Sequence, residues 1–185
     1  MNDSTAVIEF AMDDTQLGSV VIRLYEEEAP ETVASFIRMA KAGLYDGRQI
    51  RRIVPDFVLQ PSYTHFDDPR CDVELVAECA LNAFVNRVPF EKGTVAMSGD
   101  RKIASGSEFY IVLSDGAGKR LSGNFAAFGK VISGWDVVER ITNLPLIPVP
   151  NDDGVEINVP KTPVYMKRVN IEKSLDSNVT SSFIL

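Results

Sequence analysis

The sequence predicts one mainly β domain, in which about eight short strands form a mostly antiparallel barrel and two helices pack on it. Three observations favour this fold class. Short β-rich segments alternate with turn residues along the chain. Only two segments have helical periodicity, and they lie far apart, which disfavours an alternating β–α plan. The 185 residues, 45% of them hydrophobic, suit a single domain, and no internal repeat is present.

The N-terminal part predicts a hairpin and then a helix. Residues 6–12 and 19–25 are β-rich, and the polar turn between them ends in Gly18. Pro30 marks a helix start, and apolar residues then recur at helical spacing until Gly43. The three glutamates at 26–28 could form an acidic docking patch. Helix-start electrostatics on a solvated face is the simpler interpretation.

The middle of the chain predicts two strands and a long irregular segment. Residues 49–54 and 57–59 are β-rich, and the turn between them contains Pro55 and Asp56. Residues 61–92 have no sustained period, so loops are expected there.

The C-terminal half predicts four further strands and the second helix. The strands are expected at 94–98, 109–113, 126–131 and 164–171. Residues 134–141 form a short amphipathic pattern, and the prolines that follow it predict an extended connection. The domain is therefore expected to span 1–173, and the Ser/Asn/Thr-rich segment 174–185 is expected to be a flexible, dispensable tail.

Composition excludes several functional classes. A net charge of −7 and a pI near 4.8 argue against binding nucleic acid, which needs clustered Lys and Arg. No apolar run approaches the ~20 residues of a membrane helix. Residues 1–5 are polar and acidic, unlike a signal peptide, so we expect a cytoplasmic protein.

The chain offers little for a metal or a phosphate. Cys71 and Cys79 are too few for a disulfide scaffold, and with His65 and Asp67 they lack paired metal-ligand spacing. We expect two buried thiols and no metal. Residues 116–119 resemble half a phosphate loop, but a flexible turn is the simpler interpretation.

Several motifs agree in order and spacing. Residues 52–60 read Arg-Ile-Val-Pro-Asp-Phe-Val-Leu-Gln, and residues 128–131 read Phe-Gly-Lys-Val. Further matching segments are 45–47, 93–98, 105–111, 121–127 and 134–138. Together they resemble the cyclophilin family of peptidyl-prolyl cis-trans isomerases over roughly residues 6 to 172.

The resemblance implies a closed eight-stranded antiparallel barrel with two capping α-helices and a groove on its outer surface. The irregular composition of the 61–92 segment predicts that it frames the edge of this groove and sets substrate preference. The resemblance also implies a monomer that acts on proline-containing peptides and folding proteins without a cofactor. The implied catalytic residue is Arg52. The implied substrate-binding residues are Phe57, Val58, Gln60, Ser98, Gly99, Glu108, Tyr110, Leu121 and Phe125.

The sequence departs from the family pattern around this site. Arg51 replaces a histidine, Val58 a methionine, Tyr110 a phenylalanine and Phe125 a histidine. In members of the family that bind cyclosporin, a tryptophan precedes the pocket leucine. Here that residue is Arg120, so the resemblance implies weak cyclosporin binding.

The chemistry implied for Arg52 has a simple physical basis. Rotation about an X–Pro bond faces a barrier of ~18–20 kcal/mol, because amide resonance resists twisting. Twisting localises a lone pair on the prolyl nitrogen, and a fixed guanidinium N–H would stabilise that state more than the planar one.

Other interpretations stay open at this level. The altered pocket also fits a catalytically weak module that binds proline peptides or acts as a chaperone. A barrel that holds a small apolar ligand inside is a further class, which fails if side chains fill the interior. Arg52 could be a surface arginine, and Phe57, Tyr110 and Phe125 could be ordinary barrel packing, because alternation alone does not separate groove from interior.

Overall fold

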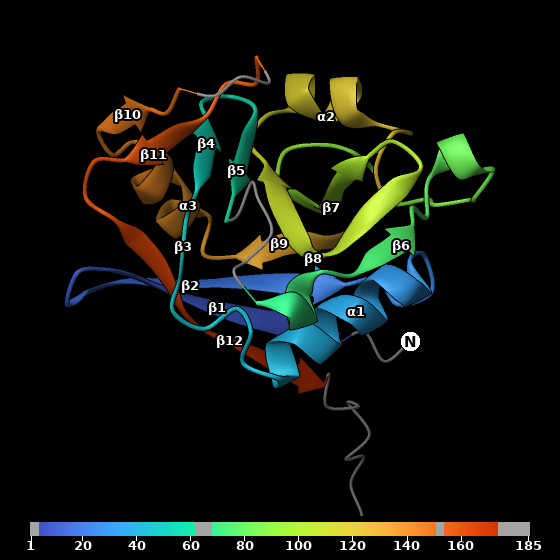
Figure 1. Cartoon of the computed structure of the whole chain (residues 1–185), viewed down its shortest axis with the longest axis horizontal. Helices are drawn as coiled ribbons and strands as arrows, with labels where there is room; N and C mark the ends of the chain where they lie inside the picture. The colour runs from blue at the N-terminus through green and yellow to red at the C-terminus, as the bar shows by residue number, and fades with distance from the viewer. Residues whose placement is uncertain (1–3, 62–67, 151–153, 174–185) are drawn as a thin grey trace, which may run out of the picture.

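The structure is a computed structural model that describes residues 4–61, 68–150 and 154–173. The expected tail at 174–185, and His65 and Asp67 of the metal hypothesis, lie outside these ranges. The described chain forms a strongly curled, mainly β fold, so the predicted fold class is confirmed at that level (Figure 1).

One antiparallel sheet contains most of the strands. They are β1 (Ser4–Met12), β2 (Thr15–Leu24), β3 (Arg48–Gln49), β4 (Arg52–Val54), β5 (Val58–Gln60), β6 (Glu74–Val76), β7 (Thr94–Asp100), β8 (Ile103–Val112), β9 (Ala127–Ser133) and β12 (Val164–Lys173). The order is β3-β12-β1-β2-β9-β7-β8-β5-β4, and β6 pairs separately with β8. All eight segments predicted as strands therefore contain strand.

The ladders form an open path of nine strands, not the expected closed circuit of eight. The two ends of the path, β3 and β4, are consecutive in the chain. Between them, the N–H of Ile50 donates to Val164 O at 2.8 Å, and the N–H of Arg51 donates to Pro61 O at 2.9 Å. The bent segment 48–54 thus pairs first with β12 and then with β5, although the sequence predicts a single strand over 49–54.

Three α-helices lie in the described part of the chain, where two were predicted. The predicted ones are α1 (Pro30–Lys41) and α3 (Trp135–Thr142). The third, α2 (Asp115–Leu121), occupies the segment interpreted as a flexible turn. Ser114 explains the difference, because its Oγ accepts from Ala117 N at 3.1 Å and so caps the helix. None of these helices combines the length and apolarity that a membrane span requires.

Two other segments were more regular than expected. Residues 61–92 contain β6 and the 3₁₀ turns η1 (Pro69–Cys71) and η2 (Ala80–Asn82). The proline-rich connection forms a second, two-stranded sheet from β10 (Leu146–Pro148) and β11 (Asn158–Pro160). Proline is tolerated in edge strands, but it interrupts the alternation of apolar and polar residues that predicts a strand. The sequence therefore predicts only an extended connection here.

The N-terminus of α1 is capped by a distant residue. Ala29, at the N-cap, provides no side-chain hydrogen bond. Instead the buried carboxylate of Glu78 accepts from Glu31 N at 3.1 Å and from Thr32 N at 2.9 Å. Two of the three glutamates at 26–28 also have partners within the protein. Glu26 accepts from Ser4 Oγ at 2.6 Å, and Glu28 pairs with Arg87 at 3.2 Å.

Side chains on the two faces of the sheet form two core clusters. The first contains Phe36, whose ring centroid lies 5.2–5.3 Å from those of Tyr45, Phe109 and Phe128. These rings fill the interior, which argues against an internal apolar ligand. The second core cluster consists of Val54, Val58, Val88, Ala96, Tyr110, Val112, Ala117, Leu121 and Ala127, with Tyr25, Phe57, Phe90 and Phe125 packed against it.

Candidate active site

Strand alternation separates the candidate site from the interior. In β4, Ile53 belongs to the first core cluster and Val54 to the second, so Arg52 shares the face of Val54. In β5, Leu59 is interior, and Val58 and Gln60 share the other face. The same alternation in β7 and β8 places Ser98 and Tyr110 there, because Met97 and Phe109 are interior.

Hydrogen bonds link Arg52, Gln60 and Ser98 across three strands. Arg52 Nη1 donates to Gln60 Oε1 at 3.1 Å, and Gln60 Nε2 donates to Ser98 Oγ at 3.2 Å. Arg52 Nε also donates to the carbonyl of Glu156 at 2.8 Å. Arg52 is half-buried and Gln60 is buried. The guanidinium is therefore held in a defined orientation.

The five predicted apolar residues meet in the second core cluster. Val58, Tyr110 and Leu121 are buried members, and Phe57 and Phe125 pack against them half-buried. The rings of Tyr110 and Phe125 meet edge to face, with centroids 5.7 Å apart. These residues come from the β4–β5 turn, β5, β8, the C-terminal end of α2 and the segment that follows it, so the fold assembles an apolar patch beside Arg52.

Tyr110 places a buried hydroxyl within the apolar patch. Burial raises the pKa of Tyr110 well above its ordinary value, and the positive charge of Arg52 opposes part of that rise. The buried Tyr110 hydroxyl has no hydrogen-bond partner among the described residues. The phenol stays neutral at physiological pH and adds no charge to the patch.

Gly99 and Glu108 lie at the edge of this group. The β7–β8 ladder pairs Met97 with Phe109 and Gly99 with Ala104, so residues 105–108 bulge opposite Ser98. Glu108 is buried in this bulge, and its N–H donates to Ser105 Oγ at 3.0 Å. Gly99 has φ +155°, and a Cβ there would lie 2.2 Å from Ile103 O, so only glycine fits.

The α2 helix brings Arg120 over Phe57. The guanidinium carbon of Arg120 lies 4.8 Å from the centroid of the Phe57 ring. Ser114 Oγ, at the start of α2, donates to Asp56 O at 2.6 Å, and Leu113 N donates to Phe57 O at 2.9 Å. These bonds join α2 to the turn that presents Phe57.

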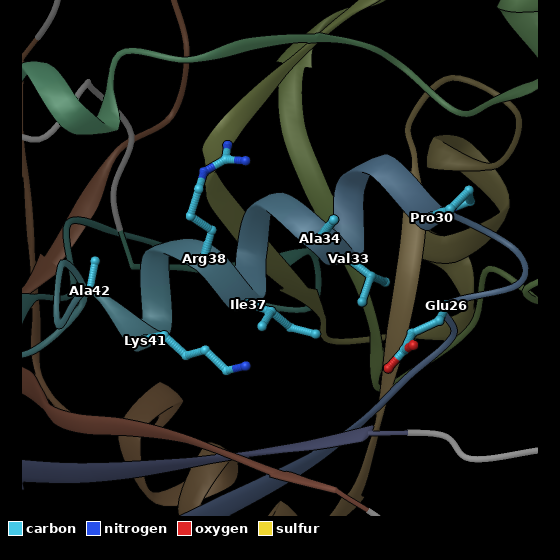
Figure 2. Close-up of a pocket in the computed structure, with 8 residues that line it drawn as sticks. All are labelled: Glu26, Pro30, Val33, Ala34, Ile37, Arg38, Lys41 and Ala42. Carbon is cyan, nitrogen blue, oxygen red and sulfur yellow. The ribbon is translucent and has the colours of Figure 1, made fainter.

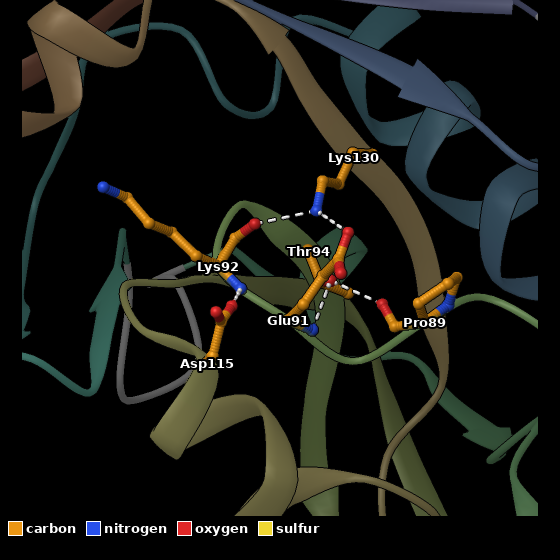
Figure 3. A network of polar contacts seen from close by, with 6 residues as sticks. All are labelled: Pro89, Glu91, Lys92, Thr94, Asp115 and Lys130. Carbon is orange, nitrogen blue, oxygen red and sulfur yellow. Dashed lines mark hydrogen bonds and ion pairs between the residues drawn. The ribbon is translucent and has the colours of Figure 1, made fainter.

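A polar network also anchors the N-terminal end of α2 (Figure 3). The carboxylate of Asp115 accepts from Lys92 N at 2.9 Å, and Lys130 Nζ donates to Lys92 O at 2.7 Å and to Glu91 Oε1 at 2.5 Å. Thr94 Oγ1 donates to Pro89 O at 2.7 Å. The network ties α2 to the 89–94 segment and to β9.

The sequence did not point to the β10–β11 hairpin as part of the site. This hairpin lies beside β4 (Figure 1). Asn158 Nδ2 donates to Ile53 O at 3.1 Å, and Glu156 O accepts from Arg52. Both contacts join residues about a hundred positions apart in the chain. No local signal could have found them.

Another hollow lies apart from this site, along α1 (Figure 2). It has a volume of about 690 Å³, and Val33 and Ile37 line it between Glu26 at one end and Lys41 at the other. None of the predicted site residues belongs to it.

The two cysteines lie outside the candidate site. Cys71 and Cys79 are buried free thiols, as predicted. Burial raises the pKa of Cys71, which disfavours the thiolate that a metal would need. The described residues contain no cluster of metal-ligating side chains.

Comparison with known proteins agrees with this geometry. The family model described as cyclophilin type peptidyl-prolyl cis-trans isomerase/CLD matches residues 7–171. The chain belongs to the cyclophilin family. This cyclophilin is 32% identical over 162 residues to a peptidyl-prolyl cis-trans isomerase of Acinetobacter baylyi, covering 85% of this chain and 82% of that protein.

Another relative supports the assignment, and a solved structure shares the fold. Peptidyl-prolyl cis-trans isomerase B of Bacillus subtilis is 33% identical over 127 residues, which cover 67% of this cyclophilin and 83% of that protein. The crystal structure of a cyclophilin type isomerase from Cryptosporidium parvum superposes with a TM-score of 0.71 over 92% of this chain and 98% of that one. At 18% identity this last similarity shows the shared fold.

Proposed function

We propose that this cyclophilin accelerates cis-trans rotation about X–Pro bonds in peptides and folding proteins, with Arg52 as the catalytic residue. The observation that carries the proposal is the anchored guanidinium of Arg52, which borders the apolar patch of Val58, Tyr110 and Leu121. A fixed cation beside an apolar surface is what the twisted prolyl amide requires. Family membership supports the same activity.

In this mechanism the proline ring rests on the apolar patch, and an N–H of Arg52 donates to the prolyl nitrogen as the amide twists. Gln60 orients the guanidinium, because its amide oxygen accepts from Arg52. The same amide donates to Ser98, so β7 holds Gln60 in turn. The backbone at Ser98 and Gly99 would bind the peptide chain beside the proline.

Arg52 alone is insufficient. Raising the rotation rate from ~10⁻² per second to ~10³ per second lowers the barrier by ~7 kcal/mol. One charge-assisted hydrogen bond contributes ~1.5–3 kcal/mol. Desolvation of the amide on the apolar patch, and orientation of the peptide, must therefore supply the rest.

Proline-exchange NMR on a short Ala-Pro peptide tests the proposal. We expect exchange cross-peaks between the cis and trans resonances at substoichiometric amounts of the purified protein. Shifts of the peptide resonances without exchange would instead favour the weak binding or chaperone module. No shift and no exchange would contradict both. Size-exclusion chromatography tests the accompanying expectation of a monomer.

A further inference from the structure

Arg120 holds a positive charge at the rim of the proposed proline pocket. Its guanidinium carbon lies 4.8 Å from the centroid of the Phe57 ring, within the range of a cation–π contact. Arg120 is exposed, whereas Phe57 is half-buried against the second core cluster. The charged head is thus open to solvent directly beside the surface on which the proline would rest.

The position of Arg120 is fixed by the packing of α2. Ser114 and Leu113 bond to Asp56 O and Phe57 O, so the helix and the aromatic ring are tied to the same turn. Close contact on the opposite side reinforces this, because a Cβ at Gly118 would lie 2.3 Å from Phe90 O. The helix can approach that segment only with glycine at position 118.

The charge of Arg120 is not neutralised within the described part of the chain. Some other arginines there pair with carboxylates, for example Arg87 with Glu28 at 3.2 Å and Arg140 with Asp136 at 3.2 Å. Arg120 has no such ion pair with any described residue. Asp115, at the other end of α2, accepts instead from Lys92 N. A second cation, Arg52, borders the same pocket.

We propose that Arg120 selects substrates in which an aspartate or glutamate stands directly next to the proline. This inference rests on the proposed isomerase function and names the substrate class for that site. A carboxylate beside the proline would supply the counter-charge that Arg120 lacks. A lysine in the same place would meet two guanidinium groups in a site that is otherwise apolar.

The expected preference is moderate, because Arg120 is exposed. Exposed ion pairs have measured values equivalent to about two- to fivefold in an equilibrium or rate ratio. We therefore expect kcat/KM for a glutamate peptide to exceed that for the matched alanine peptide by about two- to fivefold. The preference should shrink as the salt concentration rises.

The test uses peptides with Glu, Ala or Lys either before or after a single proline, followed by exchange NMR. Comparing the Glu/Lys ratio between variants cancels the intrinsic effect of each residue on the proline bond. Arg120→Gln should lower this ratio by about two- to fivefold, because Arg52 still borders the pocket, and Arg120→Glu should lower it further. Lys119→Gln is the matched control, since it removes a positive charge from the same helix at a position outside the proposed site; its ratio should stay at the wild-type value.

The outcomes separate this inference from the function beneath it. If all peptides are exchanged but Arg120→Gln leaves the Glu/Lys ratio unchanged, charge selection by Arg120 is wrong and the isomerase function stands. An equal change in Lys119→Gln would also overturn it, because net charge would then explain the effect. If no peptide is exchanged, the isomerase function fails. Dissociation constants from the same titrations then decide whether Arg120 selects for charge.

Discussion

Arg52 and Gln60 lie opposite each other in the β4–β5 ladder, and Arg52 Nη1 donates to Gln60 Oε1 at 3.1 Å. The contact joins the proposed catalytic cation to a side chain that is 2% exposed. Gln60 in turn donates to Ser98 on β7. The orientation of the guanidinium thus depends on residues from three strands. Mutation of Gln60 or Ser98 can therefore test orientation separately from the charge of Arg52 itself.

Arg52→Ala should lower kcat/KM by about ten- to a hundredfold, because it removes the charge-assisted hydrogen bond to the twisted amide. Stability should change by less than about 1 kcal/mol, since the side chain is only half-buried. Arg51→Ala is the matched control, because Arg51 is exposed and outside the Arg52–Gln60–Ser98 chain. Exchange NMR and thermal melts measure both. A loss of activity in Arg51→Ala alone would show that the catalytic arginine has been misassigned.

Gln60→Ala should reduce kcat/KM by about tenfold while Arg52 is still present, because the guanidinium loses its anchor on β5. Ser98→Ala removes only the hydrogen bond from Gln60 to β7, so its effect on kcat/KM should be smaller. Equal losses in the two variants would argue against orientation through Gln60. Peptide titrations should place most of the Gln60→Ala loss in kcat.

Alkaline pH should destabilise the protein through its buried tyrosines. Burial raises the pKa of Tyr45 and of Tyr110 in the folded state. The unfolded chain loses these protons near pH 10, so their contribution to stability is complete below that pH and is lost as the pH rises above it.

Tyr110→Phe tests this directly. It should reduce the dependence of stability on pH above about 10 by up to ~1.4 kcal/mol per pH unit. At neutral pH the substitution should be neutral or stabilising, because the buried hydroxyl has no partner among the described residues. Urea unfolding at several pH values measures both effects. An unchanged alkaline slope would mean that Tyr110 ionises equally in the folded and unfolded states.

Gly99→Ala should destabilise the protein by more than about 2 kcal/mol, because the new Cβ would collide with Ile103 O, 2.2 Å away. Gly47→Ala serves as the comparison. Gly47 also has a positive φ, +74°, but a Cβ there meets nothing within 4 Å, so its cost should be about 1 kcal/mol. Equal decreases in Tm for the two variants, measured by thermal melts, would argue against the collision.

Cyclosporin should inhibit the enzyme weakly. Arg120 stands where sensitive members have a tryptophan, and desolvating a guanidinium against an apolar ligand costs more than burying an indole. The fluorescence of Trp135 should change little on mixing, since its indole N–H donates to Glu139 on α3, outside the second core cluster. Arg120→Trp should restore sensitivity. Inhibition of the wild type at drug concentrations stoichiometric with the enzyme would contradict the prediction.

Much of the fold was readable from local sequence. The β-rich segments, the helical spacing after Pro30 and the pattern around Trp135 depend on neighbouring residues, and each became the predicted element. The motif at 52–60 predicted Arg52 and Gln60 as candidate site residues, and the structure pairs them because both lie on one hairpin. Such features depend on residues that are close together in the sequence.

The tertiary structure alone decided how these pieces meet. Alternation gives each strand two faces, and in β5 both faces are buried, so nothing local marks Val58 and Gln60 as the site side and Leu59 as interior. Glu78 caps α1 from 46 residues away, and Glu156 holds Arg52 from 104 residues away. Arg120 reaches Phe57 only because α2 is bonded to the 55–57 turn. Each of these contacts joins segments that are distant in the sequence, and their proximity is a property of the folded chain as a whole.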